Sequence, residues 1–79
     1  MNDAAIYPIL AEIFKDVFLL DAIELKPEMS EDDVEGWDSH KQIEILLLTE
    51  EHFKIRFKSN EMDSIKTVGD IVRLVREKA

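Results

Sequence analysis

Cysteine is absent from this chain, and glycine and proline occur only twice each. Without cysteine there can be no disulfide framework, no thiolate metal site and no cysteine nucleophile, so any thiol chemistry would have to arrive on a ligand. The scarcity of glycine and proline, together with 46% hydrophobic residues, favours a folded helical domain over disorder. For 79 residues we expect one domain, spanning residues 1–79, with a small core.

Long apolar runs are also missing. Asp3, Glu12 and Asp16 interrupt the apolar residues near the N-terminus, so the pattern of a signal peptide is not met, and no run approaches the roughly 20 apolar residues of a membrane span. The formal net charge of −8 disfavours nucleic acid and anionic membranes as partners. We therefore expect a cytoplasmic monomer that binds neither of them.

The negative charge is concentrated in one half of the chain. Residues 1–40 hold eleven acids and two bases, whereas residues 41–79 hold seven acids and eight bases. The acids that follow one another without a base are Glu28, Glu31, Asp32, Asp33, Glu35 and Asp38. Charge alone favours a solvated loop here; a docking surface for basic partners is the alternative, and it gains support only from the residues that follow.

Helical spacing of apolar residues marks the first segment, from about Ala4 to Leu19. The residues that follow this spacing are Ile6, Ile9, Leu10, Ile13, Phe14, Val17 and Phe18. If Asp3 capped the helix, Pro8 would lie beyond the first turn and clash with an earlier carbonyl. We therefore expect regular helix to begin near Tyr7–Pro8.

The rest of the chain predicts a long loop and three more helices. The periodicity fades over about 20–37, where Ile23, Leu25, Met29, Val34 and Trp37 could attach an ordered loop to the helices. A second helix is expected over about 39–53, and a short link follows at 54–58, with Ile55 and Phe57 in the core. After the link we expect a short helix that Ser59 or Asn60 caps and that runs through Ile65. The last helix opens at Thr67, where Thr67 and Asp70 form a capping-box variant. The fold class is all-α: a small bundle of three main helices plus one short helix, with a long ordered loop between the first two.

The second helix has more apolar residues than a single core-facing side requires. Ile45, Leu46, Thr49 and Phe53 share one side, which we assign to the core. Ile43 and Leu47 lie on another side, among carboxylates such as Glu44 and Glu51. The pair either forms a strip that docks partners or packs beneath the long loop, and spacing alone does not separate these alternatives.

Ser39 permits several interpretations. Asp38, Ser39 and His40 contain the residue types of a hydrolase triad, but neighbours on a helix point about 100° apart, which excludes one. A calcium loop with Gly36 at its sixth position would place Glu31, Asp33 and Glu35 as ligands, but Gln42 would then stand where a bidentate carboxylate is needed. His40 and Glu44 lack further metal ligands.

A helix cap is the commonest role for a serine at such a place, but Asp38 already fills the cap. The Ser39 hydroxyl is then free to project at a helix N-terminus, where the backbone amides favour a phosphate group.

At this point the sequence resembles the acyl carrier protein family. The stretches that carry the resemblance are Asp38-Ser39, 43–46 (I-E-I-L), 50–53 (E-E-H-F) and 65–70 (I-K-T-V-G-D). They are similar to the family's D-S-L motif, its acidic recognition helix ending E-E-x-F, and its I-x-T-V-x-D entry to the last helix. The stretch from Asp38 to Val75 lies on the family pattern without a gap, and the resemblance covers nearly the whole chain.

The resemblance implies a carrier and not an enzyme. It implies that Ser39 bears a covalent 4′-phosphopantetheine arm, with Asp38 capping the helix beside it, and that acyl groups are held on the arm as thioesters for fatty-acid, polyketide or related specialised biosynthesis. Implied partners are a phosphopantetheinyl transferase and acyl-transferring or condensing enzymes with basic docking patches. The implied docking residues are Glu35, His40, Ile43, Glu44, Leu47, Glu50 and Glu51, and no metal site is implied.

The sequence also departs from the family pattern. His40 replaces the usual leucine, Lys41 stands where an acid is common, and Lys54, Arg56 and Lys58 make the link basic. The Gly36-Trp37 pair is more similar to carriers of specialised pathways than to housekeeping ones. The alternative function is a small interaction or calcium-responsive module that keeps the fold without the arm.

Overall fold

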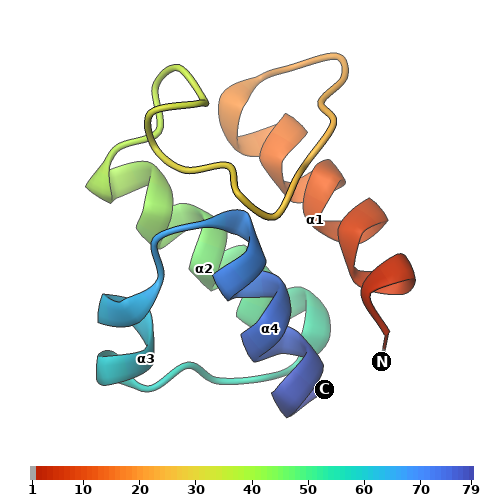
Figure 1. Ribbon diagram of the computed structural model, residues 1–79, viewed down its shortest axis with the longest axis vertical. Coiled ribbons are helices and arrows are strands. Elements are labelled where there is room, and N and C mark those ends of the chain that lie inside the picture. The colour runs from red at the N-terminus through yellow and green to blue at the C-terminus, as the bar shows by residue number, and fades with distance from the viewer. Residues whose placement is uncertain (1) are drawn as a thin grey trace.

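Four helices and the segments between them make up the fold, shown by a computed structural model that describes residues 2–79 (Figure 1). In chain order they are α1 (Asp3–Phe18), α2 (Ser39–Phe53), α3 (Ser59–Ser64) and α4 (Val68–Lys78). α1 packs against both α2 and α4, while an ion pair of 2.9 Å between Lys78 and Glu61 joins α4 to the short α3. The predicted all-α fold of three main helices, one short helix and a long loop after the first is confirmed.

The core draws on every helix except α3 and on the three connecting segments. Its buried apolar residues are Ile6, Leu10, Ile13, Phe14, Val17, Val34, Trp37, Ile45, Leu46, Ile55, Phe57, Ile65, Val68, Ile71, Val72, Leu74 and Val75. The expected core side of α2 is correct: Ile45, Leu46 and Thr49 are buried and Phe53 is half-buried. Thr49 is fully buried, and its hydroxyl is satisfied because it donates a 2.6 Å hydrogen bond to the Ile45 carbonyl.

The start of α1 differs from the expectation. The helix begins at Asp3, capped by the side chain of Asn2, and Pro8 lies inside it. Pro8 removes one hydrogen bond near the beginning of the helix, at a penalty of about 3 kcal/mol. Burial of Ile6, which is fully inaccessible, offsets much of this at about 1.5–3 kcal/mol. Arg76 also holds the first turn, because its guanidinium donates to both Asp3 carboxylate oxygens at 2.8 and 3.0 Å.

α1 and α2 end in the same way, without glycine. Leu19 and Lys54 adopt the left-handed conformation at φ 56° and 58°. The amide of the next residue then reaches back into the helix: Leu20 donates to the Lys15 carbonyl at 2.9 Å, and Ile55 to that of Glu50 at 3.1 Å. This arrangement satisfies the last carbonyls of each helix and turns the chain sharply.

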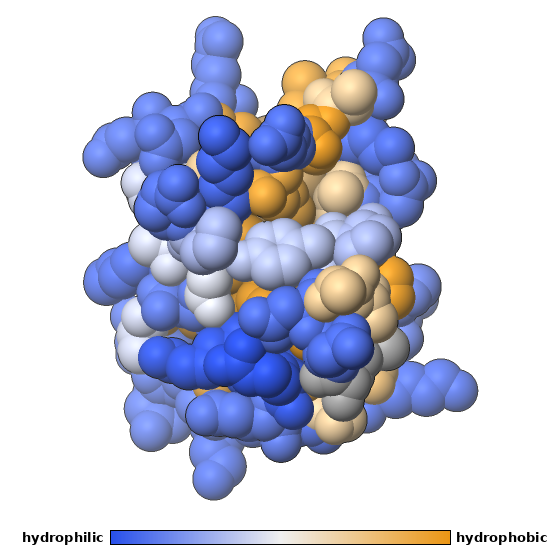
Figure 2. All heavy atoms as spheres, turned by 45° about the vertical axis from the view of Figure 1, so that its right-hand side comes forward, coloured by the Kyte–Doolittle hydropathy of each residue, from blue (hydrophilic) through white to orange (hydrophobic). Residues whose placement is uncertain are grey.

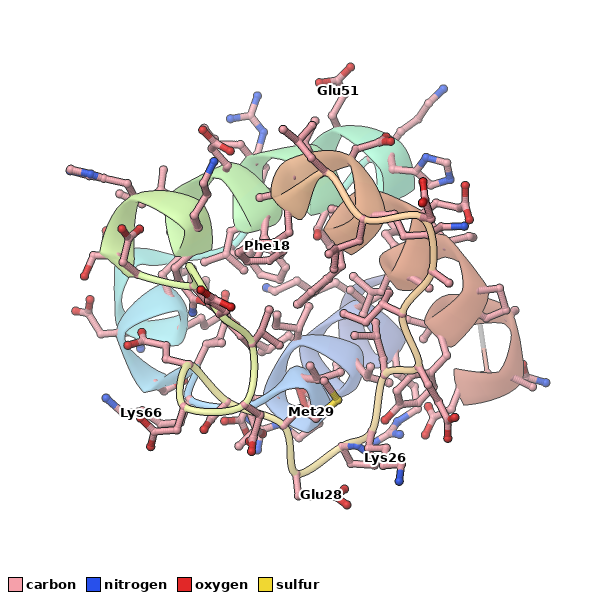
Figure 3. All side chains as sticks on the ribbon, turned by 90° about the horizontal axis from the view of Figure 1, so that it is seen from above. Phe18, Lys26, Glu28, Met29, Glu51 and Lys66 are labelled. Carbon is pink, nitrogen blue, oxygen red and sulfur yellow. The ribbon has the colours of Figure 1, made fainter. Side chains whose placement is uncertain are left out.

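The long loop between α1 and α2 is ordered, as predicted, because it is attached at both its centre and its end. The Val68 amide donates to the Met29 carbonyl and the Gly69 amide to the Pro27 carbonyl, each at 2.9 Å. Figure 3 shows Met29 above the start of α4, while Lys26 and Glu28 point outward. Nearer α2, Val34 and Trp37 are buried in the core. The free first amides of α4 therefore hold the loop in place.

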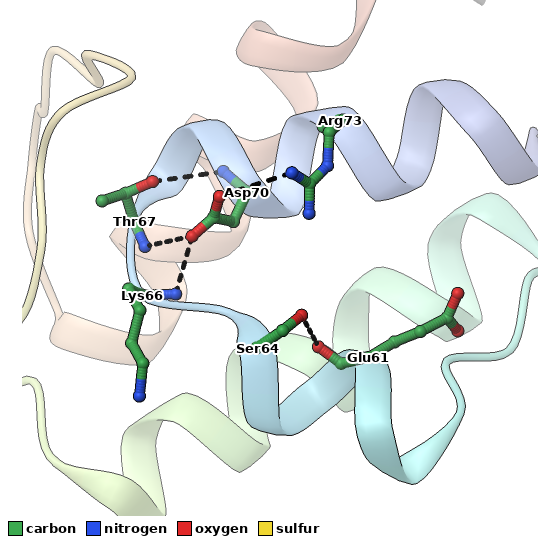
Figure 4. A network of polar contacts seen from close by, with 6 residues as sticks. All are labelled: Glu61, Ser64, Lys66, Thr67, Asp70 and Arg73. Carbon is green, nitrogen blue, oxygen red and sulfur yellow. Dashed lines mark hydrogen bonds and ion pairs between the residues drawn. The ribbon is translucent and has the colours of Figure 1, made fainter.

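The predicted capping box of α4 is present (Figure 4). The Thr67 hydroxyl accepts from the Asp70 amide at 3.2 Å, and the Asp70 carboxylate accepts from the amides of Thr67 and Lys66 at 3.1 and 2.8 Å. The cap expected for α3 is wrong: the helix already begins at Ser59, with Lys58 at the cap position. The carboxylate of Glu61, the third residue of α3, accepts from the Lys58 amide at 2.7 Å, which is the contact that the third residue makes in a capping box.

Polar and charged side chains cover most of the face seen in Figure 2, with apolar atoms visible in a band between them. Over residues 2–79, the large apolar residues that remain exposed are Leu19, Leu20, Ile43, Leu47 and Leu48. They come only from the end of α1 and from α2. No helix within the described residues has the length and apolarity needed to cross a membrane.

Gly69→Ala tests whether the loop is packed against α4. An added Cβ would lie 3.0 Å from the Pro27 carbonyl oxygen and 3.2 Å from the Pro27 Cβ. At a helical position with open space, Gly→Ala would raise the free energy of unfolding by up to about 1 kcal/mol. At Gly69 we expect the clash with Pro27 to lower the free energy of unfolding by about 1–3 kcal/mol. Chemical denaturation measures the change, with Glu77→Ala as the exposed control on α4. A more stable Gly69→Ala protein would contradict the observed packing.

Asp70→Asn tests the acid sensitivity of the capping box. The Lys66 amide, then the Thr67 amide and the Arg73 guanidinium, lower the pKa of Asp70 in the folded state. The carboxylate therefore contributes stability above the ordinary Asp pKa of about 4, and this contribution is lost as the pH falls through the folded-state pKa. We expect Asp70→Asn to lower the free energy of unfolding by about 1 kcal/mol at neutral pH. In acid the wild type and the variant should be equally stable. Denaturation curves at several pH values measure the stability of both proteins. A stability difference between the wild type and Asp70→Asn that did not change with pH would refute this prediction.

Candidate functional site

Ser39 is the first residue of α2, and its side chain is exposed. Asp38 precedes it in an extended conformation, with φ −123°, and holds the cap position. The Asp38 carboxylate accepts a hydrogen bond from the Lys41 amide at 2.9 Å, and its carbonyl accepts from the Gln42 amide at 2.9 Å. Because Asp38 supplies the cap, the Ser39 hydroxyl is not needed for this purpose, and within residues 2–79 it makes no hydrogen bond.

The Asp38 carboxylate stays ionised over a wide pH range. The Lys41 amide that donates to it is the main cause of its lowered pKa, and the nearby charge of His40 acts in the same direction. An ionised carboxylate at a helix N-terminus is favourably placed relative to the helix dipole. The hydrogen bond from the Lys41 amide thus gives Asp38 a structural role at the start of α2.

Trp37 anchors the chain directly before this site. Its ring is buried and meets Phe14 edge-on, with the ring centres 5.3 Å apart. Its indole nitrogen donates to the Gln42 side-chain oxygen at 2.8 Å, which links the loop to the first turn of α2. Gly36 provides the turn before it at φ 88°, a backbone conformation that other residues rarely adopt. Ser39 therefore stands two residues from a rigid core contact.

Lys41 fixes the same turn to the end of α1. Its ammonium group donates to the Val17 carbonyl at 3.4 Å and lies 3.6 Å from the Glu44 carboxylate. A cation at a helix C-terminus interacts favourably with the last carbonyls. The lysine that departs from the family pattern thus has a structural contact within this fold.

A shallow hollow lies beside Ser39 between α2 and α3. Its lining consists of Ser39, Gln42, Ile43, Leu46, Ser59, Met62 and Asp63. The apolar side chains of Ile43, Leu46 and Met62 meet there, with polar groups around them. Sequence reasoning did not find this hollow, because nothing in the spacing of α2 shows which side of it α3 covers.

The expected docking residues mostly project from one side of α2. Ile43 and Leu47 are 56% and 58% exposed, so they do not pack beneath the loop, and His40 is exposed on the same side. The Glu44 side chain is 54% exposed. Figure 3 shows Glu51 pointing away from the bundle. An apolar pair flanked by carboxylates is therefore open to a partner.

Glu35 and Glu50 complete the expected set, and they differ from each other. Glu35 is exposed in the loop before Trp37. Glu50 is half-buried, and its carboxylate accepts a 2.7 Å hydrogen bond from the Phe57 amide. Glu50 therefore has an internal contact that closes the chain after α2, and its docking role stays a prediction. The sequence gives no sign of this contact, because it joins residues across a sharp turn.

The acids of the long loop do not gather around a common centre. Asp33 accepts from the Ser30 amide at 2.9 Å and so stabilises a local turn. Within residues 2–79 no three His, Asp or Glu side chains are arranged to hold a metal ion.

Comparison with known proteins agrees with this geometry. Residues 8–75 match the family described as "Phosphopantetheine attachment site". The acyl carrier protein of Acidothermus cellulolyticus is 36% identical over 63 residues, covering 80% of this chain and 75% of that protein. A meromycolate extension acyl carrier protein of Mycolicibacterium aurum is 31% identical over 68 residues, covering 86% and 70%.

A solved structure is similar as well. The holo acyl carrier protein from Geobacter metallireducens, determined in solution by NMR, matches with a TM-score of 0.84 and 38% identity. The match covers 91% of this chain and 83% of that one. The resemblance on which the sequence predictions rest is confirmed.

Ile43→Asp combined with Leu47→Asp tests whether the apolar pair faces solvent. Because both side chains are more than half exposed, we expect the helix content to stay and the free energy of unfolding to change by no more than about 1 kcal/mol. The matched control is Ile45→Asp with Leu46→Asp, which buries two charges and should abolish cooperative unfolding. Circular dichroism during heating distinguishes them. Equal loss of structure in both proteins would show that Ile43 and Leu47 belong to the core.

Proposed function

The chain belongs to the acyl carrier proteins with a phosphopantetheine attachment site, and we propose that Ser39 is the residue that bears its 4′-phosphopantetheine arm. As a member of this family it is a non-catalytic carrier in fatty-acid or related biosynthesis. When bound, the arm supplies the thiol that this cysteine-free chain lacks, and acyl groups are held on it as thioesters.

The observation that carries the proposal is the exposed Ser39 hydroxyl at the N-terminus of α2. Free backbone amides at a helix N-terminus interact favourably with a phosphate group. Asp38 relieves Ser39 of capping, and Trp37 fixes the chain before it, so the hydroxyl is both free and held in place. Among residues 2–79 no other serine combines exposure with the first position of a helix of more than two turns.

When the arm is loaded from coenzyme A, the Ser39 oxygen would attack the phosphorus next to the pantetheine. The new bond joins Ser39 to that phosphorus, the bond from the phosphorus to adenosine 3′,5′-bisphosphate breaks, and the serine proton passes to a base. Asp38 is a weak base for that proton, because the Lys41 amide donates to its carboxylate and lowers its pKa. We infer that a stronger base would come from the phosphopantetheinyl transferase, and that this chain contributes an accessible hydroxyl on a fixed backbone. Such a division of work suits a protein that is a substrate and not a catalyst.

The hollow beside Ser39 would hold the part of the arm nearest to the helix. Ile43, Leu46 and Met62 offer apolar contacts to its methyl and methylene groups. Gln42 and Ser59 offer hydrogen-bonding groups to its amides. The hollow is open to solvent on its outer side, which allows the arm to leave when a partner binds.

Partner enzymes would dock on the outer side of α2. Ile43 and Leu47 would fill apolar depressions on a partner, and Glu35, Glu44 and Glu51 would pair with basic side chains. Charge complementarity of this kind speeds encounter, while a small apolar contact allows rapid release. His40, beside Ser39, lies within the same footprint. Glu50 is left out of this set because of its bond to Phe57.

The cargo and setting are also proposals. The Gly36-Trp37 pair and the similarity to a meromycolate extension carrier support a specialised fatty-acid or polyketide pathway. We propose a single domain over residues 1–79 that works as a monomer in the cytoplasm, where its coenzyme A-dependent partners act. The net charge of −8 supports partners other than nucleic acid or anionic membranes.

Incubation with coenzyme A and a broad-specificity phosphopantetheinyl transferase tests the attachment. We expect the intact mass to rise by one 4′-phosphopantetheine group, and Ser39→Ala to abolish the rise because no other hydroxyl has the same placement. Ser59→Ala, at the rim of the same hollow, is the matched control and should be loaded normally.

An interaction module without the arm is the competing function. Wild-type protein that stays unmodified with several transferases would favour that module. Loading of Ser39→Ala at the rate of the wild type would show that the site lies elsewhere.

A further inference from the structure

Three cations project from the link between α2 and α3. Along this link the side chains alternate in burial: Ile55 and Phe57 are 8% and 6% exposed, while Lys54, Arg56 and Lys58 are exposed. The alternation directs the three cations away from the core together. We call Lys54, Arg56 and Lys58 the basic triplet.

The link that carries the basic triplet is held in place at two points. The Ile55 amide donates to the Glu50 carbonyl at 3.1 Å, and the Phe57 amide donates to the Glu50 carboxylate at 2.7 Å. With Ile55 and Phe57 buried, the backbone has little freedom to turn the cations elsewhere. The backbone from which the three cations extend is therefore fixed, so binding a partner needs to order only their side chains.

The basic triplet has no internal partner among residues 2–79. The cations that lie within 4.0 Å of a carboxylate are Lys15, Lys41, Arg73, Arg76 and Lys78. In the described part of the chain Lys26 and Lys66 also lack a carboxylate within this distance, but each is isolated in the chain, whereas Lys54, Arg56 and Lys58 stand at alternate positions of one link. They are free to meet carboxylates of another molecule.

A second hollow joins the basic triplet to the docking side of α2. Leu47 and Ile55 give it apolar groups, and its remaining lining consists of the acids Glu50 and Glu51 and the cations Lys54 and Arg56. A partner side chain that contacts Leu47 is thus close to both signs of charge. The docking surface does not end at the carboxylates of α2 but continues into the triplet.

We propose that the basic triplet selects partner enzymes whose docking surface carries carboxylates opposite Lys54, Arg56 and Lys58, beside the basic groups that face Glu44 and Glu51. This inference rests on the proposed carrier function. A partner with basic groups throughout would be repelled at the triplet, because like charges brought into contact oppose binding. Selection would therefore act by exclusion of such partners as well as by attraction of the correct one.

Charge complementarity distinguishes this occupant from others. The acidic loop and net charge of −8 repel anionic membranes and nucleic acid, so three cations alone would not hold the chain on either. A protein surface with both signs of charge can match both ends of the docking side at once.

Arm transfer by a phosphopantetheinyl transferase with a wholly basic docking surface tests the exclusion. The test variant is Lys54→Glu with Arg56→Glu, and the control variant is Lys26→Glu with Lys66→Glu. Both variants change the net charge by the same amount. Lys26 and Lys66 are exposed, have no ion pair within residues 2–79 and lie outside the link. At low salt we expect kcat/KM for the first variant to exceed that of the control about tenfold. The difference should vanish at about 1 M salt, where charges are screened within a few ångströms.

A charge exchange tests the attraction. Basic residues of the transferase docking surface are changed to Glu one at a time, and at least one change should speed loading of the wild type while slowing loading of Lys54→Glu/Arg56→Glu. Equal kcat/KM for the two chain variants at low salt, or no transferase change with opposite effects, would overturn the proposal. If Ser39 were never loaded at all, the carrier function itself would fail, which is a separate outcome.

Two further measurements address other occupants of the triplet. The wild type should not sediment with phosphatidylglycerol vesicles, and its mass in solution at low salt should be that of one chain. If the wild type bound vesicles and Lys54→Glu/Arg56→Glu did not, the triplet would be a membrane site. If the wild type self-associated and this variant did not, the triplet would bind a second copy of the chain. Either result would overturn the proposal.

Discussion

The hydrogen bond between the Asp38 carboxylate and the Lys41 amide is the contact on which the site depends. It begins α2 at Ser39, satisfies an amide that would otherwise be free, and leaves the serine hydroxyl without a structural duty. The Trp37–Gln42 bond and the Lys41–Val17 contact then fix that turn to the core and to α1. A flexible arm needs a rigid base, because the partner must find the attachment point in the same position each time.

The outer side of α2 is exposed because the bundle is too small to cover it. Ile45, Leu46 and Thr49 are buried in the core where α2 packs against α1, whereas Ile43 and Leu47 remain in solvent. Their exposure would be a liability in a protein without partners. In the docking role that we propose, this exposure would serve repeated, short-lived contacts, and the surrounding charges of both signs would oppose association with mismatched surfaces. The fold therefore separates the functions of stability and recognition onto two sides of one helix.

Local chemistry explains which features could be predicted from the sequence. Asp38 and the Thr67–Asp70 pair are caps that act within four residues, and the core side of α2 follows from spacing, so all three were correctly predicted. The start of α1 was not, because Ile6 burial and the Arg76–Asp3 contact outweigh the local effect of Pro8. The Glu50–Phe57 bond and the hollow at Met62 could not be predicted either, since both depend on where the chain returns after a sharp turn.

The most direct test is to locate the arm in protein purified from its own host by fragmenting the intact chain in a mass spectrometer. The account predicts a fragment that carries phosphopantetheine, with or without an acyl group, on Ser39 alone. Native protein that lacks the group, or a modified serine at 30, 59 or 64, would contradict the claim that the exposed hydroxyl at the start of α2 is what the fold is built to present.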